Sequence, residues 1–224
     1  MVAGTRTLRQ LMLLAGFAIV AFAAITLFVL PAWKAAQTCR RQGHVLIIWG
    51  ALRNYAEFYG SLPPAYIADK NGVPMHSWRV LLLPFLEHQE LYAQYDFREP
   101  WNGPHNRLLE EKMPGVYKGA AWRNHTTTCV LTVLGSQTAW PNAKPLTYQQ
   151  LVKATASTIV LVELPDANTG WMEPRDITYD ELLARVETRR SSGDKWVGDP
   201  ILCVFAVGGV RSIPGDMSPT QLDH

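Results

Sequence analysis

The strongest constraint in this sequence is an uncharged stretch near the N-terminus, which runs from Leu11 to Leu30. Thr26 is its only residue with a hydrogen-bonding side chain. As a helix rising about 1.5 Å per residue, the stretch spans roughly 30 Å, the thickness of a bilayer's hydrocarbon core. A helix also satisfies its own backbone hydrogen bonds there. The stretch therefore predicts a transmembrane helix, with these membrane-spanning residues: Leu11, Leu14, Phe17, Val20, Phe22, Ile25, Phe28 and Leu30.

Two alternatives to a retained anchor are a cleaved signal peptide and a buried core helix. The apolar run is longer than the apolar region of a typical signal peptide, and cleavage after Ala23 would leave apolar residues on the product. So long a run is also unusual inside a small domain. We therefore expect a short N-terminal tail at residues 1–10, a transmembrane helix at 11–31 and a folded domain at 32–224. Arginines and lysines flank both ends, so their count does not set the orientation.

Composition narrows the class of protein further. Apolar residues make up 48% and charged residues 18% of the 224 residues, which is unlike a disordered chain. The net charge of +2 gives no general basic field for binding nucleic acid. The lipid bilayer is thus the first partner that the sequence predicts.

The residues after the anchor predict an α+β fold. Helical periodicity continues past Pro31 as an apolar stripe, and Gly60 ends it. Asn71-Gly72 predicts a hairpin turn, and Thr178 with Glu181 predicts a capped helix over 178–189. Runs rich in β-branched residues predict strands, with a hairpin at the third, over 126–134, 157–164 and 201–207. The expected architecture is one long N-terminal helix, transmembrane and then amphipathic, packed on a small antiparallel sheet.

The sequence predicts no catalytic, cofactor-binding or metal-binding residue. It has no Walker A, GxGxxG, GxSxG or HExxH motif, and its histidines lack zinc-site spacing. We therefore expect a protein that is not an enzyme and has no small-molecule substrate. Four acidic residues around Trp171 suggest the hypothesis of a calcium site: Glu163, Asp166, Glu173 and Asp176.

The tryptophans offer an alternative function. Aromatic side chains in exposed loops can stack on sugars or on a partner's side chains. Trp122, Trp140 and Trp171 are the candidates, and they predict a cell-surface module that binds glycan. The competing interpretation is that these rings build the core of the domain.

Three segments together carry a family resemblance. The first contains Leu52-Arg53-Asn54-Tyr55 and Tyr59 to Tyr66, the second is Ser77-Trp78-Arg79-Val80 followed by Leu81-Leu82-Leu83-Pro84-Phe85-Leu86-Glu87, and the third runs from Phe205 to Pro219. These segments resemble the pilin-like family known as domain of unknown function 1559, whose members carry a type IV prepilin-like N-terminal helix and end in a signature of His, nine residues and Asp-Gly. The resemblance implies a pilin-like, membrane-anchored domain outside the cytoplasm, with residues 1–10 as a short cytoplasmic tail, and no established activity.

The chain departs from that family pattern in several places. Arg9 stands where a prepilin has the glycine of its cleavage site, and Leu14 stands where it has a glutamate. Val207-Gly208-Gly209 replaces the terminal Asp-Gly-Ser, without the preceding histidine. The chain thus resembles a degenerate member of that family. We expect a structural or interaction role at the cell envelope, with other envelope proteins or a second copy as partner. A pseudopilin-like subunit of a secretion system is a further alternative.

If the domain lies outside the cytoplasm, its cysteines can form a disulfide. There are three, Cys39, Cys129 and Cys203, so one disulfide would leave one thiol over. Cys129 and Cys203 both fall on predicted strands, which makes them the candidate pair. The alternative is three buried thiols.

Overall fold

A computed structural model describes residues 3–119, 125–141, 144–191 and 200–213. The chain forms two compact units, Met1–Arg41 and Gln42–His224, and each is described by itself. The boundary expected between the transmembrane helix and the folded domain, at residue 31, falls ten residues earlier than this division. The difference arises because helix runs through both places without a break.

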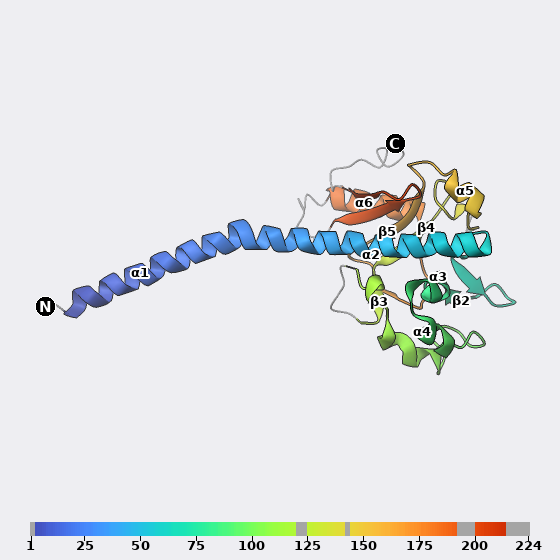
Figure 1. The fold of residues 1–224 in the computed structure, drawn as a ribbon, viewed down its shortest axis with the longest axis horizontal. Coiled ribbons are helices and arrows are strands. Elements are labelled where there is room, and N and C mark those ends of the chain that lie inside the picture. Colours follow the sequence, from blue (N-terminus) through green and yellow to red (C-terminus); the bar gives the residue numbers. More distant parts are fainter. Residues whose placement is uncertain (1–2, 120–124, 142–143, 192–199, 214–224) are drawn as a thin grey trace. The chain divides into compact units, whose positions relative to one another are not determined.

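The N-terminal helix has three consecutive parts: α1 (Ala3–Ala24), a π-helical segment η1 (Ile25–Val29) and α2 (Leu30–Tyr59) (Figure 1). Pro31 lacks the N–H that a regular helix requires at that position, and the wider turn just before it accommodates this gap. The amide of Leu30 instead bonds the carbonyl of Ile25. The prediction that the helix continues past Pro31 is confirmed.

The C-terminal part of α2 is the core helix of the second unit. Its predicted apolar stripe is buried at Val45, Ile48, Trp49, Leu52 and Ala56. Tyr59 continues the same helical spacing, but it is 59% exposed. The helix ends right after it at Gly60, whose φ of +83° suits glycine, so Tyr59 contacts Tyr55 on the surface instead.

A five-stranded sheet forms the centre of the second unit. Its strand order is β7-β4-β5-β8-β9, and the pairs β4–β5, β5–β8 and β8–β9 are antiparallel. The edge strand β7 pairs parallel with β4, which the sequence did not predict. The strands of this sheet are β4 (Val130–Leu134), β5 (Ile159–Glu163), β7 (Ile177–Thr178), β8 (Ile201–Phe205) and β9 (Val210–Ile213).

Helices cover both faces of the sheet. Val160 and Val204 share a core cluster with α2, whereas Val162 and Phe205 share one with α6. Burial on both faces explains why β5 is apolar along most of its length rather than alternating. The predicted capping box of α6 (Tyr179–Ser191) is confirmed, because the amide of Thr178 bonds Glu181 Oε2 at 2.8 Å and the amide of Glu181 bonds Thr178 Oγ1 at 3.2 Å.

The remaining elements are short. The Asn71-Gly72 turn joins β1 to β2, as predicted, and β3 pairs with β6. Thr147 and Gln150 form a second capping box, which the sequence analysis missed although it fits the same pattern. These elements are β1 (Tyr66–Ala68), β2 (Pro74–Ser77), α3 (Trp78–Leu81), η2 (Leu83–Leu86), α4 (Gln89–Gln94), η3 (Asn106–Lys112), η4 (Gly115–Tyr117), β3 (Thr127–Thr128), α5 (Tyr148–Val152) and β6 (Thr169–Gly170).

Candidate functional site

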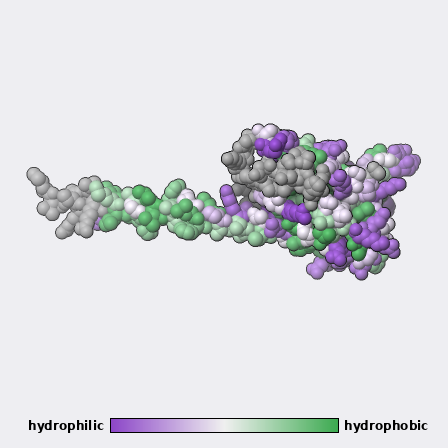
Figure 2. Space-filling view, turned by 90° about the horizontal axis from the view of Figure 1, so that it is seen from above, coloured by the Kyte–Doolittle hydropathy of each residue, from purple (hydrophilic) through white to green (hydrophobic). Residues whose placement is uncertain are grey.

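The apolar surface of the N-terminal helix is the most prominent feature of the first unit. Figure 2 shows its hydrophobic side chains along the helix, and the structure contains a helix, Gln10–Tyr59, that is long and apolar enough to cross a membrane. Thr26 donates its hydroxyl hydrogen to the carbonyls of Phe22 at 2.9 Å and Ala23 at 3.0 Å, so its polar group stays within the helix. The predicted membrane-spanning residues are between 47% and 76% exposed: Leu11, Leu14, Phe17, Val20, Phe22, Ile25, Phe28 and Leu30.

A buried ion pair joins distant segments of the second unit. The side chain of Arg79 is fully buried, and its Nη2 lies 2.9 Å from Asp176 Oδ1, whose side chain is 3% exposed. The same carboxylate oxygen accepts hydrogen bonds from Trp78 Nε1 at 3.1 Å and from the amide of Thr132 at 2.9 Å. Burial raises the pKa of Asp176, and the Arg79 guanidinium opposes that increase. The pair thus ties α3 to the sheet and to the segment before β7.

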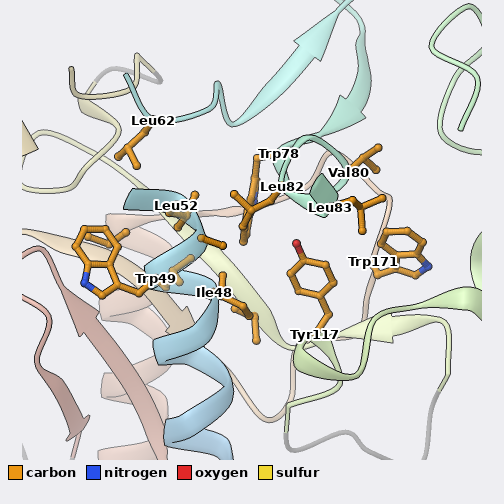
Figure 3. Close-up of a cluster of buried hydrophobic side chains, with 14 of the residues drawn as sticks. Ile48, Trp49, Leu52, Leu62, Trp78, Val80, Leu82, Leu83, Tyr117 and Trp171 are labelled. Carbon is orange, nitrogen blue, oxygen red and sulfur yellow. The ribbon is translucent and has the colours of Figure 1, made fainter. Parts of the chain in front are cut away.

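Arg79 donates its other hydrogens to backbone carbonyls and to the hydroxyl of Ser77. Its Nε and Nη2 both donate to the carbonyl of Val130, at 3.1 and 3.0 Å, and its Nη1 donates to Ser77 Oγ at 2.9 Å. Tyr117 donates its hydroxyl hydrogen to the carbonyl of Arg79 at 2.9 Å, and Figure 3 shows this hydroxyl pointing toward the α3 side chains. Such complete satisfaction is what a buried cation requires, so this cluster is a structural centre of the fold.

The prediction that exposed loop tryptophans bind glycan is wrong for the two of them that the structure describes, because both are buried. Trp140 is fully buried, and its Nε1 donates to the carbonyl of Pro63 at 2.8 Å. Trp171 is 1% exposed, stacks on Tyr117 with ring centroids 6.3 Å apart, and donates to the carbonyl of Glu110 (Figure 3). Trp122 lies outside the described residues. Loop sequence suggested exposure, but these rings fill the core because the short elements supply little other apolar volume.

The predicted disulfide does not form in this structure. Cys129 and Cys203 are both buried free thiols. Cys203 lies on β8, whereas Cys129 immediately precedes β4, and β5 lies between β4 and β8 in the sheet. Burial raises the pKa of the Cys203 thiol, which keeps it protonated. Cys39 is exposed, so the alternative of three buried thiols is also wrong.

The four acidic residues around Trp171 do not converge. Asp176 pairs with Arg79, and Asp166 pairs with Arg185 at 2.8 Å and Arg189 at 3.3 Å. Glu173 Oε2 accepts from the amide of Gly170 at 3.0 Å. No group of three metal-ligating side chains occurs among the described residues. The described residues therefore offer no cluster of carboxylates that would support the calcium hypothesis.

His76 predicts a pH dependence of stability. It is 3% exposed, lies against Tyr95 and Phe97, and its Nδ1 is 3.0 Å from the Tyr95 hydroxyl. Burial lowers the pKa of His76 in the folded chain. As the pH falls, the imidazole of His76 is therefore protonated in the unfolded chain at about pH 6.5, before it is protonated in the folded chain. We expect the free energy of unfolding to fall as the pH drops through that value. Denaturant titrations of His76→Phe should show a shallower fall, and an unchanged slope would contradict the prediction.

The architecture defines a class of protein: an α+β unit that follows, in the chain, an N-terminal helix long and apolar enough to span a membrane. Residues 48–136 match the family described as Protein of unknown function (DUF1559). The match confirms the resemblance to that family and includes the Ser77-Trp78-Arg79 segment and the Leu83-Pro84-Phe85 block. No curated protein and no solved structure matches the chain.

Proposed function

We propose that the protein is a single-pass membrane protein whose pilin-like second unit lies outside the cytoplasm and serves a structural or interaction role at the cell envelope. The observation that carries the proposal is the apolar surface of residues 11–30, whose large side chains are exposed along the whole stretch. Exposing such an apolar surface to water is strongly unfavourable, whereas contact with the hydrocarbon core of a bilayer is favourable.

The second unit supports a role in binding rather than catalysis. Its buried charged pair is fully engaged in hydrogen bonds within the fold, so it is not available to a substrate. The family resemblance supports placement outside the cytoplasm, and other envelope proteins or a second copy are the proposed partners.

Cys39 provides a test of both anchoring and orientation. It is exposed and lies just after the apolar stretch, whereas Cys129 and Cys203 are buried. We expect the protein to remain in the membrane pellet after alkaline carbonate extraction. A membrane-impermeant maleimide should label intact cells that produce it, and Cys39→Ser should abolish this labelling.

Two outcomes would overturn the proposal. Release into the carbonate supernatant would show that the helix is not held by lipid. Labelling of Cys39 only after the cells are permeabilised would place the second unit in the cytoplasm. A variant that lacks residues 11–30 should move to the soluble fraction and serves as the control for extraction.

A further inference from the structure

A small cleft on the second unit lies where α2, α5 and the turn between β8 and β9 meet. Its volume is about 170 Å³, which is below the range of about 300–1,000 Å³ for pockets that take drug-sized ligands. The size therefore favours a ligand of only a few non-hydrogen atoms. Its lining includes Trp49 and Arg53 from α2, Leu151 and Val152 from α5, and Ala206 and Val207 from the turn.

The indole of Trp49 brings an unused hydrogen-bond donor to this cleft. Trp49 is 4% exposed, and Figure 3 shows its ring nitrogen on the edge turned away from the other labelled side chains. A methyl group added at Gly208, in the β8–β9 turn, would lie 3.5 Å from Trp49 Nε1, so this edge faces the turn. Nε1 forms no hydrogen bond within the described part of the chain, whereas Trp78, Trp140 and Trp171 all donate theirs. A buried indole N–H ordinarily has a partner, so an acceptor from outside the chain would complete the site.

Arg53 adds a positive charge beside this donor. It follows Trp49 by one helical turn, so both side chains project from the same side of α2. Arg53 is exposed, is the only charged residue that lines the cleft, and forms no ion pair or hydrogen bond within the described residues. Glu57 is the only acidic residue within four sequence positions of any lining residue, whereas Lys153 and Arg211 lie within the same separation. The local charge balance therefore favours an anion.

The walls of the cleft are apolar and open to solvent. Val152 is 65% exposed and Val207 is 62% exposed, and they come from different elements. Covering them with an apolar group is favourable, and an inorganic anion such as phosphate has none to offer. Apart from the hydroxyl of Tyr148, the lining side chains hold no oxygen that could accept a hydrogen bond from a peptide N–H. The ligand should thus combine a negative charge with a short apolar chain.

We propose that this cleft binds a short-chain monocarboxylate, with its carboxylate on Arg53 and the indole N–H of Trp49 and its apolar chain against Val152 and Val207. A guanidinium matches a carboxylate in two-point contact, and an indole N–H only donates, so both groups require an acceptor. The small volume and the scarcity of acceptors favour a free acid over the C-terminus of a peptide. The inference goes beyond the proposed function and does not depend on the side of the membrane on which the unit lies.

The test follows the indole N–H signal of Trp49 by NMR in the full chain, labelled with nitrogen-15 at tryptophan and held in nanodiscs of neutral lipid. The signal is assigned by its absence in Trp49→Phe. The probe is isovalerate, a short branched monocarboxylate. We expect a saturable shift of the Trp49 signal, whereas the signals of Trp140 and Trp171, which donate to backbone carbonyls, should stay in place. Arg53→Gln should weaken binding at least about tenfold, the scale of one lost charge-assisted hydrogen bond.

Matched controls separate the site from general electrostatics. Arg107→Gln removes an exposed arginine on η3, outside the cleft, and should leave the affinity within about twofold. Isovaleramide has the same shape without the charge, and acetate has the charge without the apolar chain. Each should bind at least about tenfold more weakly than isovalerate.

Several results would overturn the proposal. These are the absence of a shift with isovalerate, equal losses in the two arginine variants, and equal affinity for isovaleramide or acetate. A tripeptide that ends in valine and binds more tightly than isovalerate would assign the cleft to peptide C-termini and reject the free acid. Carbonate extraction and Cys39 labelling do not involve this cleft, so the proposed function and this inference can fail independently.

Discussion

Replacing Arg79 with methionine is expected to lower the free energy of unfolding by about 3–5 kcal/mol. The substitution keeps much of the side-chain volume but leaves the Asp176 carboxylate, which is 3% exposed, without its cation. It also removes the donors to the carbonyl of Val130. Denaturant unfolding of the full chain in a mild nonionic detergent, followed by tryptophan fluorescence, measures the loss.

The same variant should acquire a characteristic pH dependence. Without Arg79, only burial and the neighbouring donors act on Asp176, so the pKa of its carboxyl rises further in the folded state. A folded-state pKa raised above the unfolded value of about 3.9 gives stability that is lost as the pH rises from acid toward neutral. Relative to the parent protein, Arg79→Met should therefore be least impaired in acid.

Two control variants make the Arg79 result interpretable. Arg175→Met removes an exposed arginine nearby and should change stability by no more than about 0.5 kcal/mol. The double variant Arg79→Met with Asp176→Leu removes both charges and should recover part of the loss, because no unpaired charge remains buried. Parent-like stability of Arg79→Met, or no recovery in the double variant, would show that the pair does not act as described.

Gly119→Ala is expected to destabilise the fold by about 2–5 kcal/mol. Gly119 has a φ of +51°, a left-handed conformation that costs about 1–2 kcal/mol for other residues. A methyl group there would also collide with Cys129 Sγ and lie 2.7 Å from Glu163 Oε1. Overpacking a buried site of this kind adds about 1–3 kcal/mol. The measurement is the same unfolding titration.

A second glycine serves as the matched comparison for Gly119. An added Cβ at Gly115 would meet no atom within 4 Å, and this glycine has no left-handed φ. Gly115→Ala should therefore be close to neutral. Removing the colliding sulfur with Cys129→Ala should restore part of the stability of Gly119→Ala but not the backbone component. Equal stability of the two alanine variants would contradict the steric account.

Local patterns of the sequence predicted the elements well. The long apolar stretch, the apolar stripe after it and Gly60 fixed the N-terminal helix and its end. The Asn71-Gly72 turn and the Thr178–Glu181 capping box were also identified correctly. These features depend on residues within a few positions of one another, so periodicity and capping chemistry are sufficient to find them.

The features that the sequence did not reveal depend on distant segments. Arg79 stands in a run that reads as an ordinary short helix, and its partner Asp176 follows almost a hundred residues later. The pairing of Cys129 with Cys203 failed for a related reason, because strand order decides which side chains are neighbours and β5 lies between them. Trp140 and Trp171 lie in loop-like sequence, yet tertiary packing buries both.

The wide turn at Ile25–Val29 has a consequence for the length of the N-terminal helix. A π-helical turn contains one more residue than the α-helical turn it replaces, so the segment is equivalent to a one-residue insertion in an α-helix. Loss of one residue inside this turn would leave the following side chains facing the same way. The same loss elsewhere in the helix would rotate every later side chain by about 100°.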